Sequence, residues 1–306
     1  MGGDELWHGE LRKLITGEIL FDEPAASHTS IGVGGKIDAL CFPRSEEELA
    51  SVVAFCRARG IPFLPVGNWT NLIVRGNGYR GVLISTTGLR ALKVSDAAEG
   101  CVRLEAEAGL PLAEMVNLSV REALGGMEFC AGIPGSVGGA VRMNAGAYGG
   151  EIKDICLAVR LIDPAEGIRA LTRGELDFSY RNLDLPAESI IIGAAFQLRR
   201  GEGARIAERV REIIALRREK HPLEFRSAGS IFKNPKGVPA GRLIEAAGLK
   251  GTAIGDAQVS EKHGNFIVNR GRATAEELLG LIDLVRQGVE ATTGHILETE
   301  VRIIGE

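Results

Sequence analysis

The sequence predicts an α+β fold that is built in more than one lobe. Between Gly81 and Leu198, short apolar strands are interrupted by few helices, which favours α+β over a regular βαβ array. After Gly201–Gly203 the pattern changes to loops, helices and short strands, which indicates a separate small α+β domain. A chain of 306 residues is also long for one hydrophobic core, so two or three lobes are expected.

The first lobe is anchored by a helix predicted over Ser45–Arg59. Ser45 and Glu48 have the spacing of a capping box, and an apolar residue recurs on one helical face. Gly60 follows the last helical residue and is the usual helix terminator. The neighbouring elements are a short helix over residues 4–16, turns over His28–Asp38 and a buried strand over Ile61–Val66.

The rest of the chain is assigned in the same way. Thr274 and Glu277 form a second capping box, which begins a helix over Thr274–Thr292. The strands before residue 200 are read in the segments GVLIST, CVRLEAEAG, LAVRLID and IIIGAAFQL. The other predicted elements are helices Pro111–Leu124, Arg205–Lys220 and Gly241–Ala247, strands Gly264–Asn269 and Leu297–Ile304, and a loop at Phe225–Pro235.

Two glycine-rich loops, at residues 67–74 and 128–150, predict an anion site. Glycine permits positive φ and lacks Cβ, so successive backbone amides can converge on a diphosphate. Neither loop fits the GxGxxG spacing of a Rossmann site, so the pyrophosphate of a flavin in another fold is favoured. Ser136, Thr70, Asn68, Asn71 and Asn144 would add side-chain donors. The alternative for residues 128–150 is a set of tight turns.

Three further segments contain candidate catalytic groups. The segment FRSAGSIFKNP brings together the hydroxyl of Ser230, the ammonium of Lys233 and the amide of Asn234, although Ser230 alone could be a turn hydroxyl. Arg181 follows Tyr180 between two strands and suits a carboxylate ligand, or a plain surface turn. Glu300 alternates with apolar residues near the C-terminus, where a half-exposed strand is the simpler interpretation.

Composition narrows the class of protein. The net charge is −4 without a basic run, so nucleic acid is not an expected partner. The apolar runs are far shorter than a membrane span, and the charged N-terminal segment does not resemble a secretion signal. Five scattered cysteines without a CxxC motif indicate core thiols in a reducing cytoplasm and neither disulfides nor a metal site.

Seven segments together resemble the UDP-N-acetylenolpyruvoylglucosamine reductase family. In chain order they are HTSIGVGG, GNWTNLIV, AGIPGSVGGAVRMNAGAYGG, FSYRNLD, RSAGSIFKNP, AAGLKG and LETEVRIIG, from about His28 to Gly305. The resemblance implies an FAD-binding fold of the p-cresol methylhydroxylase/vanillyl-alcohol oxidase type. Its expected parts are an N-terminal helix (1–20), an FAD-binding domain (21–200, lobes about 21–88 and 89–200) and a substrate-binding domain (201–306).

The resemblance also implies an activity and three catalytic residues. NADPH would reduce FAD, and hydride would then pass from flavin N5 to the β-carbon of UDP-N-acetylglucosamine enolpyruvate, giving UDP-N-acetylmuramate for peptidoglycan. Arg181 resembles the family's catalytic arginine, Ser230 the proton donor to the α-carbon, and Glu300 the catalytic glutamate. A cytoplasmic monomer with no metal is expected.

Further contacts follow from the same resemblance. Substrate contacts are expected from Tyr180, Lys233, Asn234 and Tyr148. The first loop departs from the family pattern, because Trp69 stands where the family usually has glycine, so Trp69 must be strained or the loop reshaped. FAD contacts are expected from Gly67, Asn68, Thr70, Asn71, Leu72, Gly132, Pro134, Gly135, Ser136, Gly138, Gly139, Asn144, Gly146, Ala147, Ile192 and Arg226.

The short connection from Arg181 to Ile190 resembles the shorter type of this family, which lacks a loop that closes a tyrosine over the substrate. Tyr148 is then a candidate for that work. Two other functions stay open at this point. One is a different FAD-dependent oxidoreductase on the same fold, such as an oxidase, and the other is a non-catalytic flavin-binding scaffold.

Overall fold

The computed structural model describes residues 4–306, with side chains from Trp7 onward, and groups them into two compact units. The first contains residues 4–21, 39–68 and 81–215, and the second contains 22–38, 69–80 and 216–306. Two segments from the N-terminal third therefore belong with the C-terminal residues. The predicted domain limits at residues 20 and 200 remain a prediction. Residues 1–3 of the predicted N-terminal helix lie outside the described part of the chain.

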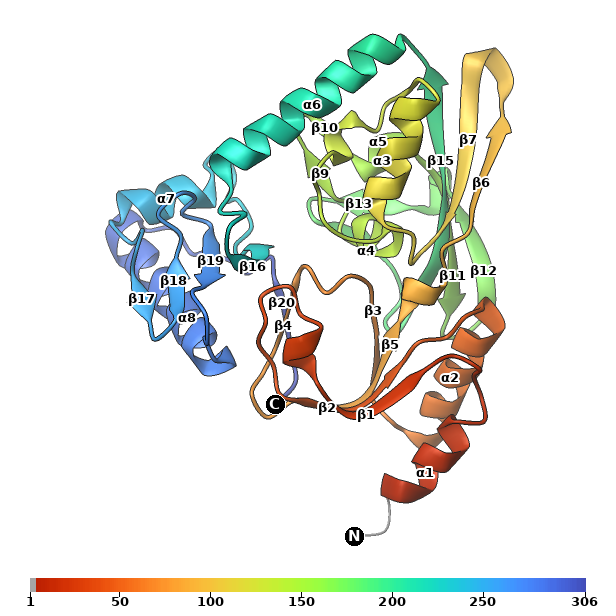
Figure 1. Cartoon of the computed structure of the whole chain (residues 1–306), viewed down its shortest axis with the longest axis horizontal. Coiled ribbons are helices and arrows are strands. Elements are labelled where there is room, and N and C mark those ends of the chain that lie inside the picture. The colour runs from red at the N-terminus through yellow and green to blue at the C-terminus, as the bar shows by residue number, and fades with distance from the viewer. Residues whose placement is uncertain (1–3) are drawn as a thin grey trace. The chain divides into compact units, whose positions relative to one another are not determined.

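The first unit is built on a sheet in the order β12-β11-β15-β7-β6, with β8 paired to β15. Helices α3 and α4 pack against this sheet, and its core includes Leu104, Met115, Val141 and Phe196 (Figure 1). The elements are β6 (Leu92–Asp96), β7 (Cys101–Glu107), α3 (Leu112–Arg121), β8 (Leu124–Gly125), α4 (Val137–Arg142), β9 (Gly146–Ala147), β10 (Gly150–Glu151), α5 (Ile152–Ile155), β11 (Cys156–Asp163), β12 (Gly167–Thr172), β13 (Asp177–Ser179), β14 (Asn182–Asp184) and β15 (Ile190–Arg200). Helix α6 (Gly203–Lys220) begins in this unit and continues into the second after Ala215.

A second sheet has the order β1-β2-β5-β3, and the chain crosses the boundary between the units within β1, β2 and β5. Strands β3 and β5 are parallel, with Phe63 opposite Val82. Leu49, Val53 and Cys56 of α2 pack in the core of this part. Its elements are α1 (Asp4–Leu11), β1 (Ile19–Pro24), β2 (Lys36–Cys41), α2 (Glu46–Arg59), β3 (Phe63–Val66) and β5 (Tyr79–Ser85).

The second unit holds an antiparallel sheet, β16-β19-β18-β17, and a parallel pair, β20-β4. Helix α8 contacts β17 and β18, and its buried face joins a core with Ile231, Phe232 and Ile267 (Figure 1). Its elements are β4 (Leu72–Val74), β16 (Arg226–Ser230), α7 (Ala240–Ala246), β17 (Ala253–Ile254), β18 (Ala257–Val259), β19 (Phe266–Asn269), α8 (Ala275–Thr293) and β20 (Arg302–Ile304).

Three predicted elements differ from the structure. Helix 4–16 ends at Leu11. The predicted loop 225–235 contains strand β16, because its backbone pairs with β19, and the predicted strand 297–304 is regular only from Arg302. Within the described residues, no helix is long and apolar enough to cross a membrane.

Candidate active site

Arg181 lies at the turn of a tight hairpin in the first unit. Strands β13 and β14 pair Ser179 with Asn182, so Tyr180 and Arg181 form a two-residue turn. Arg181 has φ of 57°, and its Nη1 donates to the carbonyl oxygen of Gly146 at 3.2 Å. Positive φ is costly for a side chain with Cβ, and such strain is frequent at functional sites. The hairpin thus presents Arg181 from a constrained backbone.

Asn144 fastens this hairpin to the glycine-rich segment. It is 2% exposed, and its Nδ2 donates to Glu151 Oε2 at 2.8 Å and to the carbonyl of Ser179 at 3.0 Å. Its Oδ1 accepts from the amide of Lys153 at 3.0 Å. Hydrogen bonds from Lys153 and Asn144, together with the Arg181 charge, lower the pKa of Glu151. The side-chain amide of Asn144, which was predicted to bind the flavin, is therefore bonded within the protein. One of its partners, Ser179, lies two residues before Arg181.

The two predicted cofactor loops meet in the first unit, at Gly67 and Ser136. A Cβ on Gly67 would lie 2.3 Å from Ser136 Oγ, which is closer than any real Cβ contact. Ser136 begins the short helix α4, and its Oγ accepts from the amide of Gly139 at 3.5 Å. A side chain at position 67 would therefore displace the Ser136 hydroxyl, and glycine avoids this where the two loops approach.

The amides of the glycine-rich segment have two different roles. Val137 and Gly138 donate to the carbonyls of Leu110 and Ala108, and a Cβ on Gly138 would lie 2.8 Å from that of Ala108. These two amides hold the segment on the core and are not available to an anion. By contrast, in residues 4–306 no hydrogen bond is recorded for the amides of Gly132, Gly135 and Ser136. Those three donors fit a diphosphate such as that of FAD.

The remaining predicted ligand-binding residues of this unit differ in how far their side chains are exposed. Ile192 is fully buried in a hydrophobic core, and its carbonyl accepts from the amide of Ala108, so its side chain does not reach a ligand. Gly146 and Ala147 pair with Glu151 and Gly150 in the β9–β10 hairpin. Pro134 is exposed, as is Tyr180, whereas Tyr148 packs partly against the core with φ of 50°.

Ser230 ends strand β16 in the second unit, directly after a β-bulge. The register with β19 shifts between Ser227 and Ser230, and Gly229 within the shift has φ of 75°. A bulge re-aims the following side chain, and bulges are common beside active sites. Ser230 is half-buried opposite Phe266, and Gly229 lies beside the carbonyl of Thr70. The predicted proton donor therefore lies next to the first cofactor loop.

Glu300 is held to the same segment through its backbone. Its amide donates to the carbonyl of Ile231 at 2.7 Å, and Thr299 bridges to Phe232. Asn71 Nδ2 donates to the carbonyl of Glu300 at 3.2 Å, and the amide of Arg302 donates to the carbonyl of Asn71. Ser230, Glu300 and the loop of Thr70, Asn71 and Leu72 are thus brought together within one unit.

Trp69 has the left-handed conformation that was expected to cause strain there. Its φ is 55° and its side chain is 7% exposed, with the indole 5.5 Å from the ring of His28. The carbonyl of Trp69 also accepts from the amide of Ser30 at 3.2 Å. The loop therefore keeps the positive φ of a glycine and buries an aromatic ring, which confirms the strained alternative.

The charged candidates of the second unit form contacts within it. Arg226 donates to the carbonyls of Thr29 and Ser30, at 3.0 and 3.3 Å, and so fastens the segment 28–35. Lys233 Nζ lies 3.2 Å from Glu298 Oε2, and Asn234 Oδ1 accepts from the amide of Ala240, at the start of α7. An FAD contact by Arg226 and substrate contacts by Lys233 and Asn234 remain predictions.

One residue that sequence reasoning did not identify is Asn265. It is 4% exposed, and its side chain binds both the amide and the carbonyl of Phe232. The sequence offers only a weak signal, an asparagine between Gly264 and an apolar strand, because its partners are backbone groups far away in the chain.

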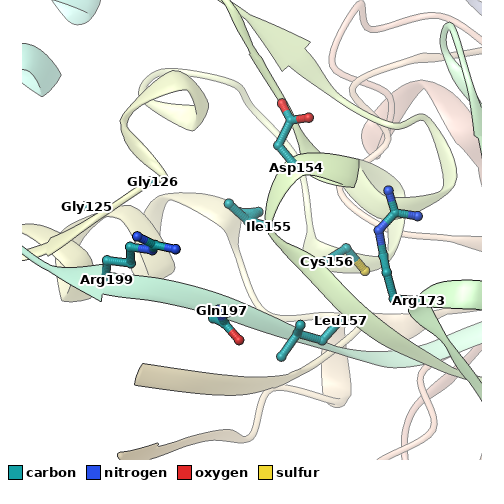
Figure 2. Close-up of a pocket in the computed structure, with 9 residues that line it drawn as sticks. All are labelled: Gly125, Gly126, Asp154, Ile155, Cys156, Leu157, Arg173, Gln197 and Arg199. Carbon is teal, nitrogen blue, oxygen red and sulfur yellow. The ribbon is translucent and has the colours of Figure 1, made fainter. Parts of the chain in front are cut away.

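A pocket of about 480 Å³ in the first unit is lined by none of the predicted site residues. Figure 2 shows Arg173 and Arg199 on opposite sides of it, with Asp154 and Cys156 between them. Burial raises the pKa of the Cys156 thiol to about 11, which makes that thiol unreactive at neutral pH. Within residues 4–306, no cluster of His, Cys, Asp and Glu that could hold a metal is found.

Comparisons with known proteins identify the family of the chain. Residues 37–171 match the FAD binding domain family, and residues 221–304 match the C-terminal domain of UDP-N-acetylenolpyruvoylglucosamine reductase. The reductase of Syntrophus aciditrophicus is 52% identical over 97% of this chain and 95% of its own length. The reductase of Heliobacterium modesticaldum is 46% identical over 97% of this chain and 94% of its own length.

A solved structure supports the same assignment. The crystal structure of the reductase from Thermus caldophilus superposes with a TM-score of 0.79 at 33% identity, covering 95% of this chain and 100% of that one. Both the relatives and the fold therefore agree with the resemblance of the seven motifs. The chain belongs to the UDP-N-acetylenolpyruvoylglucosamine reductase family.

Proposed function

We propose that Arg181, Ser230 and Glu300 carry the reaction of this family in this chain. That reaction is the reduction of UDP-N-acetylglucosamine enolpyruvate to UDP-N-acetylmuramate for peptidoglycan, with FAD as cofactor and NADPH as reductant. The observation that carries the proposal is the joining of the Ser230 segment to the Glu300 segment through the carbonyl of Ile231. This link supports the proposal, because it brings the segments of Ser230 and Glu300 together beside the loop that is predicted to bind FAD.

The residues present fit FAD. The amides of Gly132, Gly135 and Ser136 would hold its diphosphate, and Gly67 lets the first loop approach the second. When bound, FAD supplies the hydride that it has received from NADPH. Asn68, Thr70, Asn71 and Leu72 would position it from the first loop, together with backbone groups of the second.

Ser230 is the proposed proton donor. Addition of hydride to the β-carbon of the enolpyruvyl group leaves a pair of electrons on the α-carbon, which the adjacent carboxylate stabilises. The Ser230 hydroxyl then donates its proton to the α-carbon, where the electron pair forms the new C–H bond. The serine oxygen regains a proton from water. Serine is a weak acid in water, but an enolate carbon is a strong base, so the transfer is favourable.

Arg181 and Glu300 act at the substrate carboxylate in this proposal. Negative charge grows on that carboxylate during hydride addition, and a guanidinium can stabilise it by two parallel hydrogen bonds. Glu300 can assist at the same group only as a neutral acid, because two carboxylates would repel each other. Tyr180, Lys233 and Asn234 are proposed to bind other parts of the substrate.

The tyrosine loop of the longer type is proposed to be absent, because only residues 185–189 separate β14 from β15. Tyr148, which has positive φ in the turn between β9 and β10, is our candidate to cover the substrate in its place. We also propose a monomer that acts in the cytoplasm. Five buried free cysteines support a reducing compartment.

The substitution Ser230→Ala tests the proton-donor role. We expect NADPH to reduce the bound flavin at the normal rate, while reoxidation by the enolpyruvyl substrate slows about 100- to 10,000-fold, as loss of a general acid does. Anaerobic stopped-flow absorbance of the flavin measures both half-reactions.

Ser227→Ala is the matched control, because Ser227 lies on the same strand. It should leave both half-reactions near normal. Unchanged turnover in Ser230→Ala would reject the assignment. Rapid flavin reoxidation by oxygen, with none by the enolpyruvyl substrate, would favour an oxidase instead.

A further inference from the structure

Asn265 connects the two proposed catalytic residues of the second unit. Its Oδ1 accepts from the amide of Phe232 at 2.9 Å, and its Nδ2 donates to the carbonyl of Phe232 at 2.8 Å. Its backbone carbonyl accepts from the amide of Ile231 at 2.9 Å. Three hydrogen bonds from one buried residue therefore fix the three successive peptides between Ser230 and Lys233.

Two of these peptides, 231–232 and 232–233, also hold the Glu300 segment through their other polar groups. The carbonyl of Ile231 accepts from the amides of Glu300 and Val301, at 2.7 and 3.3 Å. The next residue along, Lys233, donates its amide to the carbonyl of Glu298 at 2.9 Å. One hydrogen bond thus links Asn265 to the backbone next to Ser230. Two successive hydrogen bonds, through the peptide between Ile231 and Phe232, link it to the backbone of Glu300.

The regular strands end at this stretch, so side-chain hydrogen bonds restrain it, from Asn265 on the Ser230 side and from Asn71 on the Glu300 side. The regular pairing of β16 with β19 is interrupted by the bulge at Gly229, and β20 becomes regular only at Arg302. Ser230 and Glu300 both lie at these irregular ends, where side-chain hydrogen bonds must replace the sheet ladder. The Asn265 amide supplies them for Phe232, and its burial keeps water from competing.

We propose that Asn265 is a positioning residue, which fixes the Ile231 and Phe232 peptides and so sets where the Ser230 hydroxyl and the Glu300 carboxylate lie. This inference rests on the proposed function of those two residues. It assigns Asn265 no contact with substrate or cofactor. Proton transfer depends steeply on geometry, and a displacement of about 1 Å can slow a reaction about 100-fold.

The substitution Asn265→Asp tests this role while keeping the shape of the side chain. The carboxylate replaces the Nδ2 donor by an acceptor, so it repels the carbonyl of Phe232 and releases that peptide. We expect normal FAD content and normal reduction by NADPH. Reoxidation by the enolpyruvyl substrate should slow by about 100-fold. The solvent deuterium isotope effect on that step should rise, because proton transfer becomes slower.

Asn269→Asp is the matched control. Asn269 is also a buried asparagine, 6% exposed, and it also binds backbone groups: the carbonyl of Ile31 and the amides of Gly271 and Ala273. It lies at the end of β19 and forms no recorded bond to residues 230–232 in the described chain. A merely structural role would make the two variants equal in stability loss and equal in both half-reactions.

The possible outcomes distinguish a failure of the positioning role of Asn265 from a failure of the proposed function. If the unaltered enzyme is not reoxidised by the enolpyruvyl substrate, the proposed function fails and the inference fails with it. If the unaltered enzyme reacts but Asn265→Asp behaves like Asn269→Asp, only the inference is overturned. Should Asn265→Asp not fold, Asn265→Ser, which is smaller and uncharged, is measured in the same way, and a normal oxidative rate there overturns the positioning role.

Discussion

Trp69 offers a direct test of how backbone strain and burial balance in the first cofactor loop. Its φ of 55° lies in the left-handed region, and its side chain is only 7% exposed. Replacement by glycine removes a left-handed penalty of about 1–2 kcal/mol. It also removes a buried indole, which costs about 3–5 kcal/mol in comparable aromatic truncations. The expected net change for Trp69→Gly is a loss of about 1–4 kcal/mol.

A second variant isolates the backbone contribution. Trp69→Ala removes nearly the same side chain but keeps a Cβ at positive φ. At ordinary positions glycine is less stable than alanine by about 0.5–1 kcal/mol. At position 69 the order should reverse, with glycine more stable by about 1 kcal/mol, because only alanine pays the steric cost.

The assay is calorimetric unfolding of the flavin-free protein, since bound FAD would add its own stabilisation. The unaltered protein should be the most stable, then Trp69→Gly, then Trp69→Ala. An alanine variant as stable as the glycine variant would refute the argument from φ. A glycine variant as stable as the unaltered protein would refute the argument from burial.

Two other predictions concern the cofactor cradle and the histidines of the second unit. Gly67→Ala should lower the FAD content of the purified protein, measured by absorbance, because the new Cβ would lie 2.3 Å from Ser136 Oγ. The control variant Gly174→Ala should bind FAD normally, because its new Cβ meets nothing within 4 Å. Burial lowers the pKa of His221 to about 4, so the unfolded chain binds more protons below about pH 6.5. Stability should therefore fall between pH 6.5 and 4, and less steeply in His221→Asn; equal slopes would contradict this.

Helix ends could be predicted from the sequence because their signals are local. Thr274 and Glu277 form the expected capping box, and Gly60 ends α2 with φ of 64°. The predicted box at Ser45 is only half present. Ser45 accepts from the amide of Glu48, but the Glu48 carboxylate accepts from the amides of Arg44 and Thr16 instead. A partner 32 residues away in the chain displaced the local one.

The strands around the site could not be predicted because their pairing is non-local. Residues 226–230 contain two serines and a glycine and lack an apolar alternation, yet they form β16 through bonds to β19. Leu297 and Val301 are buried as their alternation suggests, but the segment between them follows the irregular backbone of Ile231 and is not a regular strand. Alternation therefore predicted burial there better than it predicted a strand.

Residue type suggested which groups could take part in chemistry, but not the partners that hold them. Ser230 and Glu300, whose catalytic roles remain a proposal, lie in the same unit. Asn144 was expected to bind the flavin, yet its amide holds the carbonyl of Ser179. Asn265 has the same kind of role and was missed. An asparagine that binds backbone leaves no periodicity or motif, so only the folded chain identifies it.

Asn71, in the loop predicted to bind FAD, is linked by a hydrogen bond to Glu300, a proposed catalytic residue. Strand β4 follows Asn71 and pairs in parallel with β20, with Leu72 opposite Arg302, so the loop predicted to hold FAD continues into the strand next to Glu300. A shift of this loop must therefore move the glutamate as well. Arg181 belongs to the other unit, where its Nη1 donates to the carbonyl of Gly146. Residues 70–72 and the Glu300 segment are therefore joined within the second unit, while the Arg181 hairpin is held by Asn144 within the first unit.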